Sequence, residues 1–189
     1  MKQLRRLLLL LAAIVLAGAG WRGWYVWQRE RSQDEPILAA AQRYGVEPAL
    51  VKAVVWRESW FNPHARGRAG EIGLMQLREP AAREWAEAER IAGFTHEHVL
   101  DPATNTLAGA WYLAKALKRY TNTDNPVPYA LADYNAGRGN VLKWLQGPAA
   151  TNSAAFTEQI GFPMTQRYVR SVMARREHYA PVFPAKKNE

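Results

Sequence analysis

The sequence predicts a mainly α-helical single domain that follows an N-terminal membrane segment. Three observations predict it: a basic start runs into an apolar stretch, apolar side chains recur at helical spacing afterwards, and no alternating run is long enough for a sizeable sheet. The chain has 189 residues, of which 48% are hydrophobic and 22% charged. This is the composition of a folded protein whose body can bury a normal core.

Residues 1–27 have the pattern of a membrane-targeting segment. Lys2, Arg5 and Arg6 precede an unbroken apolar or small run at 7–19, which lacks the polar face of a core helix. The Ala-Gly-Ala at 17–19 fits signal cleavage. Alternatively the run continues to residue 26, past interfacial tryptophans, and approaches the roughly 20 residues of a membrane span. We favour an uncleaved anchor that leaves the body outside the cytoplasm, with 28–35 as a charged linker.

The body, residues 36–183, is predicted to be a succession of helices, with 184–189 as a tail. A helix over 36–44 ends at Gly45. Pro48 begins the next one, which carries an apolar stripe at helical spacing. Pro63 disfavours helical backbone at the residue before it, so that helix ends by 62. The polar, glycine-rich stretch 62–73 is expected to be a loop or small hairpin.

Four more helices are expected further along the chain. One covers 80–89, and Asp101 followed by Pro102 is a strong start for another. Leu107, Trp111, Ala114 and Leu117 are expected to line one face of that helix. A further helix covers 128–135 before Gly137, and a last one covers 165–179. No internal repeat is present.

Composition removes several kinds of site. The chain has no cysteine, which excludes disulfides, thiolate metal sites, a cysteine nucleophile and a lipidated cysteine. The net charge of +8 favours an anionic partner. We find no nucleic-acid motif or single basic stripe, so we expect no nucleic-acid partner. His96 and His98 lack a spaced third ligand, so we expect no metal and no cofactor.

Glu58 is the residue with the most distinctive surroundings. It lies near the end of an apolar helix beside Trp56, Trp60 and Phe61. Poor solvation and the negative end of a helix dipole both raise the pKa of a carboxyl. A carboxyl that is protonated near neutral pH suits a general acid. The local sequence alone leaves a solvent-facing glutamate as the commoner alternative.

A series of short motifs surrounds this glutamate in order. Glu58-Ser59 is followed by Asn62-Pro63, by Gly-Glu-Ile-Gly-Leu-Met-Gln at 70–76, by Ala-Leu-Ala-Asp-Tyr-Asn-Ala-Gly at 130–137, and by Phe-Pro-Met-Thr at 162–165 before Tyr168. In this order and at these separations they closely resemble the lytic transglycosylases of the soluble-lytic-transglycosylase (SLT) type. The resemblance covers roughly residues 36–179.

The resemblance implies a goose-type-lysozyme-like fold with a glycan groove. It implies cleavage of the β-1,4 bond between N-acetylmuramic acid and N-acetylglucosamine in peptidoglycan, in the bacterial periplasm or envelope, without a cofactor. The family's lone glutamate matches Glu58. That residue protonates the glycosidic oxygen and then acts as base on the muramoyl 6-hydroxyl, whose attack leaves a 1,6-anhydro end.

The resemblance also implies roles for the neighbouring motif residues. Gln76 can donate to and accept from an N-acetyl group, while Tyr134 can orient that group or Glu58 through its hydroxyl. Asn135 binds substrate or caps a helix. Met75 packs the groove floor or, equally, the core. Asp133 is expected to be structural, yet it is the best candidate for a second carboxylate.

Some positions depart from the family pattern or carry a structural expectation. Gly67 stands where many members have a serine that contacts the site, Arg78 where a methionine is common, and Met164 where a glutamate is usual. These departures bear on contacts with the acetamido group and on subsites. Gly73 is expected to let the backbone approach the sugar closely.

Three alternatives stay open at this point. A water-using muramidase would leave reducing ends instead of anhydro ends. A non-catalytic wall-binding or scaffold protein could keep the fold, although retention of Glu58, Gln76 and Tyr134 together argues against it. The protein could also open the wall for a larger machine, whose identity the residues do not specify.

Overall fold

The computed structural model describes residues 2–183, without the side chains of residues 2, 4, 7, 8, 10 and 12. The tail expected at 184–189 lies outside the described residues. The chain divides into two compact units, Met1–Asp34 and Glu35–Glu189.

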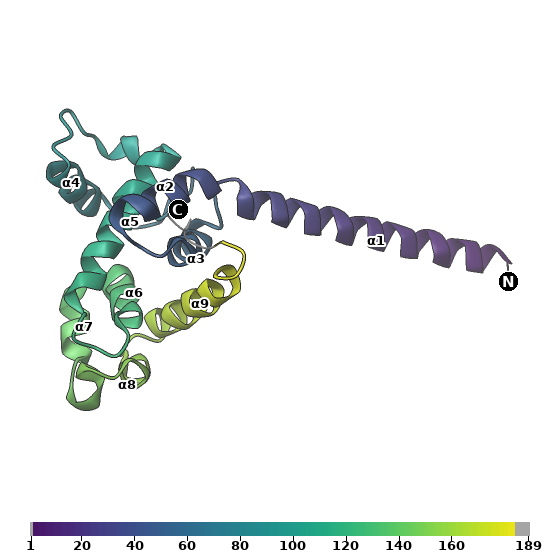
Figure 1. The fold of residues 1–189 in the computed structure, drawn as a ribbon. Helices are drawn as coiled ribbons and strands as arrows, with labels where there is room; N and C mark the ends of the chain where they lie inside the picture. The colour runs from purple at the N-terminus through teal and green to yellow at the C-terminus, as the bar shows by residue number, and fades with distance from the viewer. Residues whose placement is uncertain (1, 184–189) are drawn as a thin grey trace. The chain divides into compact units, whose positions relative to one another are not determined.

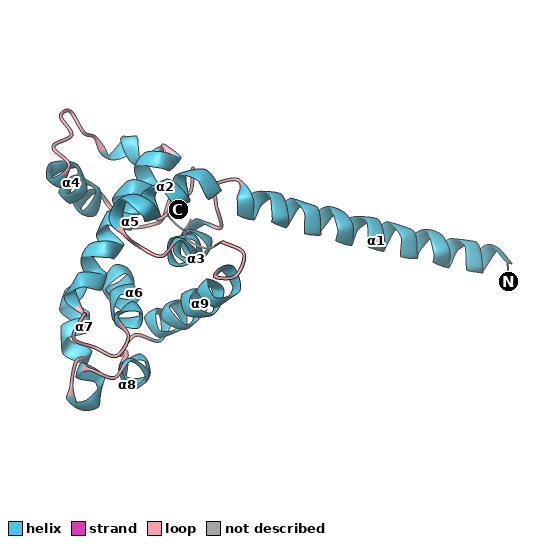
Figure 2. Cartoon of the chain, in the orientation of Figure 1, coloured by secondary structure: helices cyan, strands magenta, loops and turns pink. Residues whose placement is uncertain are grey.

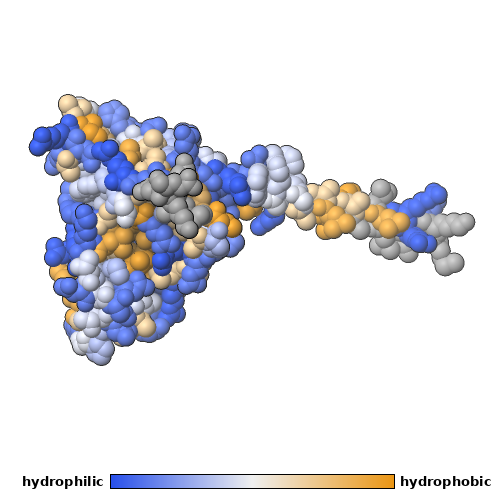
Figure 3. Space-filling model, viewed as in Figure 1, coloured by the Kyte–Doolittle hydropathy of each residue, from blue (hydrophilic) through white to orange (hydrophobic). Residues whose placement is uncertain are grey.

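The first unit consists mostly of helix α1 (Lys2–Arg31). Large apolar side chains cover it, and Figure 3 shows a band of hydrophobic surface along it. These exposed side chains include Leu9, Leu11, Ile14, Val15, Leu16, Trp21, Trp24 and Trp27. Most of the segment expected as a linker is helical, since α1 runs to Arg31 and α2 starts at Asp34. Among the described residues, no helix has both the length and the apolarity that a membrane span requires.

The second unit is helical, as predicted, and its elements can be followed in Figures 1 and 2. The α-helices are α2 (Asp34–Tyr44), α3 (Pro48–Ser59), α4 (Glu79–Ala88), α5 (Pro102–Arg119), α6 (Pro126–Ala136), α7 (Arg138–Trp144), α8 (Ser153–Gln159) and α9 (Pro163–Tyr179). Two 3-10 helices, η1 (His96–Leu100) and η2 (Gly147–Ala150), complete the set. Residues 2–183 contain no extended strand; Ile72 makes isolated antiparallel bridges to Arg66 and Leu77.

The predicted helix boundaries agree with the structure to within two residues at most ends. Proline occupies the first turn of α3, α5 and α9, and the Asp101 carboxylate caps α5 by accepting from the Thr104 N–H. The sequence analysis missed α7, α8 and both 3-10 helices. Gly137, expected only to end a helix, has φ of 81° and also precedes α7. One glycine in this conformation therefore separates two consecutive helices.

The core is built around α3, which is buried from Pro48 to Val55 and packs against α9. Helix α6 packs against both α5 and α9. As predicted, Leu107, Trp111 and Leu117 lie on α5, where they are half-buried and pack against the core. The fully buried part of α5 also carries small residues such as Gly109, where a Cβ would lie 2.3 Å from the Met75 sulfur. The pattern of large apolar residues in the sequence does not reveal this face, because most of its residues are small.

Candidate active site

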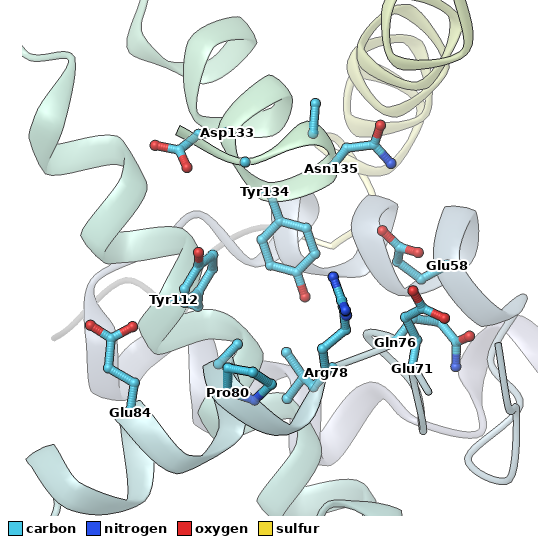
Figure 4. A pocket seen from close by; sticks show the side chains of 14 residues that line it. Glu58, Glu71, Gln76, Arg78, Pro80, Glu84, Tyr112, Asp133, Tyr134 and Asn135 are labelled. Carbon is cyan, nitrogen blue, oxygen red and sulfur yellow. The ribbon is translucent and has the colours of Figure 1, made fainter. Parts of the chain in front are cut away.

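A cleft of about 540 Å³ opens in the second unit between α3, the segment at 71–78, α4, α5 and α6. Figure 4 shows its side chains gathered from these separate parts of the chain. The lining residues are Glu58, Glu71, Gln76, Leu77, Arg78, Pro80, Ala81, Glu84, Tyr112, Asp133, Tyr134, Asn135, Ala136 and Gly137. Three of the predicted substrate-binding residues and the predicted acid are therefore brought together.

Glu58 occupies the last turn of α3, and the chain turns sharply after it. Trp60 and Phe61 both have left-handed backbone, with φ of 49° and 60°. Such backbone is unfavourable for bulky residues and persists where surrounding packing enforces it. Here Phe61 is buried in the core, and the Trp60 N–H closes the helix by donating to the Trp56 carbonyl at 3.0 Å. This turn ends the helix one residue after the acid, with Glu58 on the wall of the cleft.

The environment of Glu58 favours its protonated form. Burial raises its pKa from the usual 4.5 to about 7, and the nearby charge of Glu71 acts in the same direction. The hydrogen bond donated by the Tyr168 hydroxyl to Oε1, at 2.7 Å, and the positive charge of Arg57 act in the opposite direction. Glu58 is thus poised to exchange a proton near neutral pH, as the sequence analysis predicted.

The cause of the raised pKa of Glu58 differs in part from the prediction. Trp60 keeps 38% of its surface exposed, and the aromatic residue in contact with the carboxyl is Tyr168 of α9. Arg57 does not form an ion pair with its neighbour; its Nε donates to the Ser171 hydroxyl at 3.1 Å. The carboxyl is thus desolvated by burial in the folded domain, where it contacts α9 through Tyr168.

Gln76 lies near Glu58 and Glu71 in Figure 4 and has strained backbone, with φ of 48°. Its Nε2 donates to the carbonyls of Ala65 at 3.1 Å and Gly73 at 2.9 Å. These bonds use both amide hydrogens within the loop, so Oε1 is the atom available to a ligand. Gln76 therefore offers the cleft an acceptor, rather than the donor–acceptor pair that was predicted.

Gly73 is required by the packing of the core, a role that the sequence did not predict. Its φ is 81°, and a Cβ there would lie 2.0 Å from the Asn105 amide nitrogen and 2.6 Å from the Val99 carbonyl. The buried Asn105 accepts from the Met75 N–H at 2.7 Å and donates to the Ile72 and Val99 carbonyls. Asn105 thereby satisfies the backbone of an irregular segment that has no ladder of its own.

Tyr134 and Met75 are joined by a hydrogen bond. The Tyr134 hydroxyl donates to the Met75 carbonyl at 2.8 Å, and burial raises the pKa of Tyr134 well above its usual value, so the phenol stays protonated. The Met75 side chain is fully buried and does not line the cleft. The structure thus favours the core-packing alternative for Met75, while Tyr134 forms part of the wall.

Asn135 lies at the rim of the cleft. Its Oδ1 accepts a hydrogen bond from the Thr165 hydroxyl at 2.8 Å, across from the first turn of α9. This bond orients the amide so that Nδ2, a donor, remains for a ligand. Of the three departures from the family pattern, Arg78 lines the cleft, whereas Met164 is 63% exposed and does not.

Asp133 lines the cleft but is held as a structural carboxylate. Its Oδ2 accepts from Arg119 at 2.8 Å and from the Tyr120 hydroxyl at 2.9 Å, and its side chain has no exposed surface. Figure 4 shows it beyond Tyr134 from Glu58, with its carboxylate pointing away. The expectation that Asp133 is the best second carboxylate is not supported, because Glu71 occupies that place beside Gln76 and Glu58.

The histidines have structural contacts. The His98 Nδ1 accepts from the Thr95 N–H at 3.1 Å in the cap of η1, and a ring nitrogen of His96 lies 2.9 Å from the Leu77 carbonyl. Within residues 2–183, no group of three or more His, Cys, Asp or Glu side chains is arranged as a metal site.

Sequence reasoning missed two residues that act on Glu58. Tyr168 was expected only as an inward-facing member of the closing motif, although its position in that motif was a usable signal. Glu71 was quoted within its motif without a role. Its proximity to Glu58 depends on the fold of the loop, which no spacing reveals.

Comparison with known proteins shows which domain family and which proteins this chain resembles. The family model of the transglycosylase SLT domain matches residues 35–157. The soluble lytic murein transglycosylase of Escherichia coli K12 is 34% identical over 136 residues, which are 71% of this chain and 21% of that protein. Membrane-bound lytic murein transglycosylase F of Desulfosudis oleivorans is 36% identical over 108 residues, covering 56% of this chain and 22% of that protein.

A solved structure of a lytic transglycosylase has a similar fold. An inactive glutamate-to-glutamine mutant of lytic transglycosylase Slt from Pseudomonas aeruginosa superposes with a TM-score of 0.71 at 27% identity, covering 78% of this chain and 24% of that one. The chain spans about a fifth of the length of these curated relatives.

Proposed function

The chain belongs to the transglycosylase SLT domain family, and from that premise we propose that it is a peptidoglycan lytic transglycosylase with Glu58 as its acid and base. It cleaves the β-1,4 bond between N-acetylmuramic acid and N-acetylglucosamine and leaves 1,6-anhydro-muramoyl ends. The relatives' names, which all specify lytic murein transglycosylases, support the substrate class.

The observation that carries this proposal is the position of Glu58, which lies on the wall of the cleft and is largely withdrawn from water. Burial raises its pKa to about 7, so a large fraction of the molecules hold the proton at neutral pH. In the first step the acid gives this proton to the glycosidic oxygen as the bond to C1 breaks. The resulting carboxylate then takes the proton of the muramoyl 6-hydroxyl while that oxygen bonds to C1.

This sequence of steps needs one enzymic carboxylate that changes role. The attacking hydroxyl belongs to the sugar itself, so its effective concentration at C1 is high. An ordinary glycosidase instead uses two carboxylates, one of which acts as nucleophile or activates water. The Tyr168 hydroxyl, 2.7 Å from Oε1, stabilises Glu58 when it is ionised between the two steps.

The remaining cleft residues bind the glycan in this proposal. The Gln76 Oε1 accepts from an acetamido N–H, and the Asn135 Nδ2 donates to a sugar oxygen. Tyr134 forms the wall beside them and, through its bond to the Met75 carbonyl, fixes the segment that carries Gln76. Met75 supports the site from the core.

We also propose that the N-terminal segment directs the protein to the bacterial envelope and keeps it at the inner membrane. The basic residues before an apolar run, the exposed apolar side chains along α1 and the membrane-bound relatives support this location. Fractionation of cells that express the full chain, followed by mass measurement of the product, tests it. A mature protein that begins after residue 19 would indicate a cleaved signal, and a cytoplasmic product would contradict export.

Digestion of purified sacculi, analysed by mass spectrometry, tests the activity. The parent protein is expected to release muropeptides with anhydro-muramoyl ends, and Glu58→Gln to lose at least about a hundredfold in rate, since the amide cannot donate an acidic proton. Glu158→Gln, a change at an exposed glutamate of α8 paired with Arg170, serves as the control. Reducing ends would indicate a water-using muramidase, and equal digestion by Glu58→Gln would refute the catalytic assignment.

A further inference from the structure

The Glu71 side chain, which lines the cleft, lies in the space that Gly67 leaves open. Gly67 is half-buried, and a Cβ there would lie 2.3 Å from Oε2 of Glu71 and 3.0 Å from Oε1 of Gln76. Real Cβ atoms essentially never approach other atoms as closely as 2.3 Å. The Glu71 carboxylate therefore occupies space that any side chain at position 67 would take.

The Glu71 carboxylate is also held in place by its own loop. Its Oε2 accepts from the Ala69 N–H at 3.0 Å, and the backbone carbonyl of Glu71 accepts from the Gly67 N–H at 2.7 Å. An ionised carboxylate is an acceptor only, and acceptor is the role that Glu71 plays here. None of the described lysine, arginine or histidine side chains forms an ion pair with it; the nearby Arg66 pairs with Glu97 instead.

Three groups act on the ionisation of Glu58: Arg57 on its own helix, Tyr168 on α9 and Glu71 in the loop. Tyr134 on α6 also lies near enough for the charge of Glu58 to act on it. Both tyrosines are neutral at ordinary pH, because burial raises the pKa of each well above its usual value. Arg57 carries the positive charge of this set, and Glu71 carries the negative one.

We propose that Glu71, seated in the space that Gly67 leaves open, is a positioning residue whose negative charge holds the catalytic proton on Glu58. A negative charge close to a second carboxyl disfavours ionisation of that carboxyl, most of all where water is partly excluded. Glu71 offsets the positive charge of Arg57 and so preserves the effect of burial. Gly67 and Glu71 act as a pair, because a side chain at position 67 would displace the carboxylate.

This inference rests on the proposed function only for its consequence in catalysis. Its direct test is the titration of the Glu58 side chain by NMR, with ¹³C-labelled glutamate and the Glu58→Gln variant to assign the signal. Glu71→Gln keeps the size of the side chain and an oxygen for the Ala69 N–H, but removes the charge. Glu97→Gln is the matched control, since it removes an exposed carboxylate that braces the same loop through Arg66.

The expected result is a Glu58 midpoint near 7 in the parent protein, lower in Glu71→Gln and unchanged in Glu97→Gln. Gly67→Ala provides an independent route, because the added methyl group pushes the flexible end of Glu71 aside without removing the charge. It should lower the midpoint in the same direction by a smaller amount. If Glu71→Gln does not fold, Gly67→Ala carries the test.

The kinetic readout follows from the titration. Above the midpoint, each unit by which the midpoint falls reduces the protonated fraction about tenfold, so kcat/KM of Glu71→Gln on sacculi should begin to fall at a lower pH than that of the parent protein. An unmoved midpoint in both Glu71→Gln and Gly67→Ala, or an equal shift in Glu97→Gln, would overturn the inference. The proposed function fails separately, if the parent protein does not cleave glycan strands.

Discussion

Two of the four carboxylates that line the cleft, Asp133 and Glu58, lie in opposite surroundings. Asp133 has no exposed side-chain surface, and its Oδ2 receives hydrogen bonds from the Arg119 guanidinium and the Tyr120 hydroxyl. Glu58 is also largely withdrawn from water, yet its hydrogen-bond donor is the neutral Tyr168. The difference is a guanidinium in direct contact with one carboxyl and a phenol in contact with the other.

This difference determines what each group does. The Asp133 carboxylate contacts the Arg119 guanidinium and the Tyr120 hydroxyl, and through these contacts it ties α6 to α5. A buried carboxyl without such a partner retains its proton, and its pKa rises to about 7. Burial alone is therefore a poor guide to catalysis, and the nature of the contacting donor separates the structural acid from the catalytic one.

The largest effect is expected when the Asp133 pair is broken. Arg119→Ala leaves a buried carboxylate without its cation, which should lower the free energy of unfolding by about 3–5 kcal/mol. Arg170→Ala removes the cation of an exposed pair with Glu158 and should cost about 1 kcal/mol or less. Urea denaturation at neutral pH measures both. Equal losses would mean that Asp133 is not held as an ion by Arg119.

A smaller effect of opposite sign is expected at Glu58. Its folded-state pKa lies above the usual 4.5, so its contribution to stability is fully present below pH 4.5 and is lost as the pH rises through about 7. Glu58→Gln should therefore raise the free energy of unfolding at pH 8, by at most about 3 kcal/mol, and leave it nearly unchanged at pH 4. Denaturation at the two pH values checks this, and a variant destabilised at pH 8 would speak against a desolvated acid.

The smallest of these effects concerns the phenol that contacts the acid. Tyr168→Phe removes the donor to Oε1 and should cost about 1 kcal/mol of stability. Because that bond lowers the pKa of Glu58, its loss should raise this pKa and move the alkaline limb of the pH–rate profile to higher pH. A limb that moves to lower pH would show that Tyr168 donates elsewhere in solution.

The sequence predicted the parts of the molecule that helical patterns and caps encode. The apolar stripe of α3, its proline start and the acid near its end all follow from local rules, and so do α5 and α9. The irregular segment between α3 and α4, which carries Phe61 and Gln76, does not follow from local rules. Gln76 and Phe61 adopt left-handed backbone because side chains 30 or more residues away, such as Asn105 for the Gln76 segment, satisfy or enforce it. The contact of Gly73 with Asn105 could not be predicted for the same reason.

The site residues also fall into two groups, those that the motifs predicted and those that only the fold identifies. Glu58, Gln76, Tyr134 and Asn135 lie at the cleft as predicted from their motifs, whereas Met75 is buried beneath it. The second carboxylate was sought at Asp133 because that residue belongs to the Tyr134 motif. Only the fold shows that Arg119 and Tyr120 bond to Asp133, and that the Glu71 carboxylate lies in the space beside Gly67 and lines the cleft.

The dependence of kcat/KM on pH tests the central claim most directly, since it reports the ionisation of the free enzyme's essential groups. With soluble peptidoglycan fragments as substrate, the account predicts that the rate falls to half near pH 7 as Glu58 loses its proton. A rate already declining above pH 4.5, or one constant up to about pH 9, would contradict a catalytic acid whose proton is retained by burial.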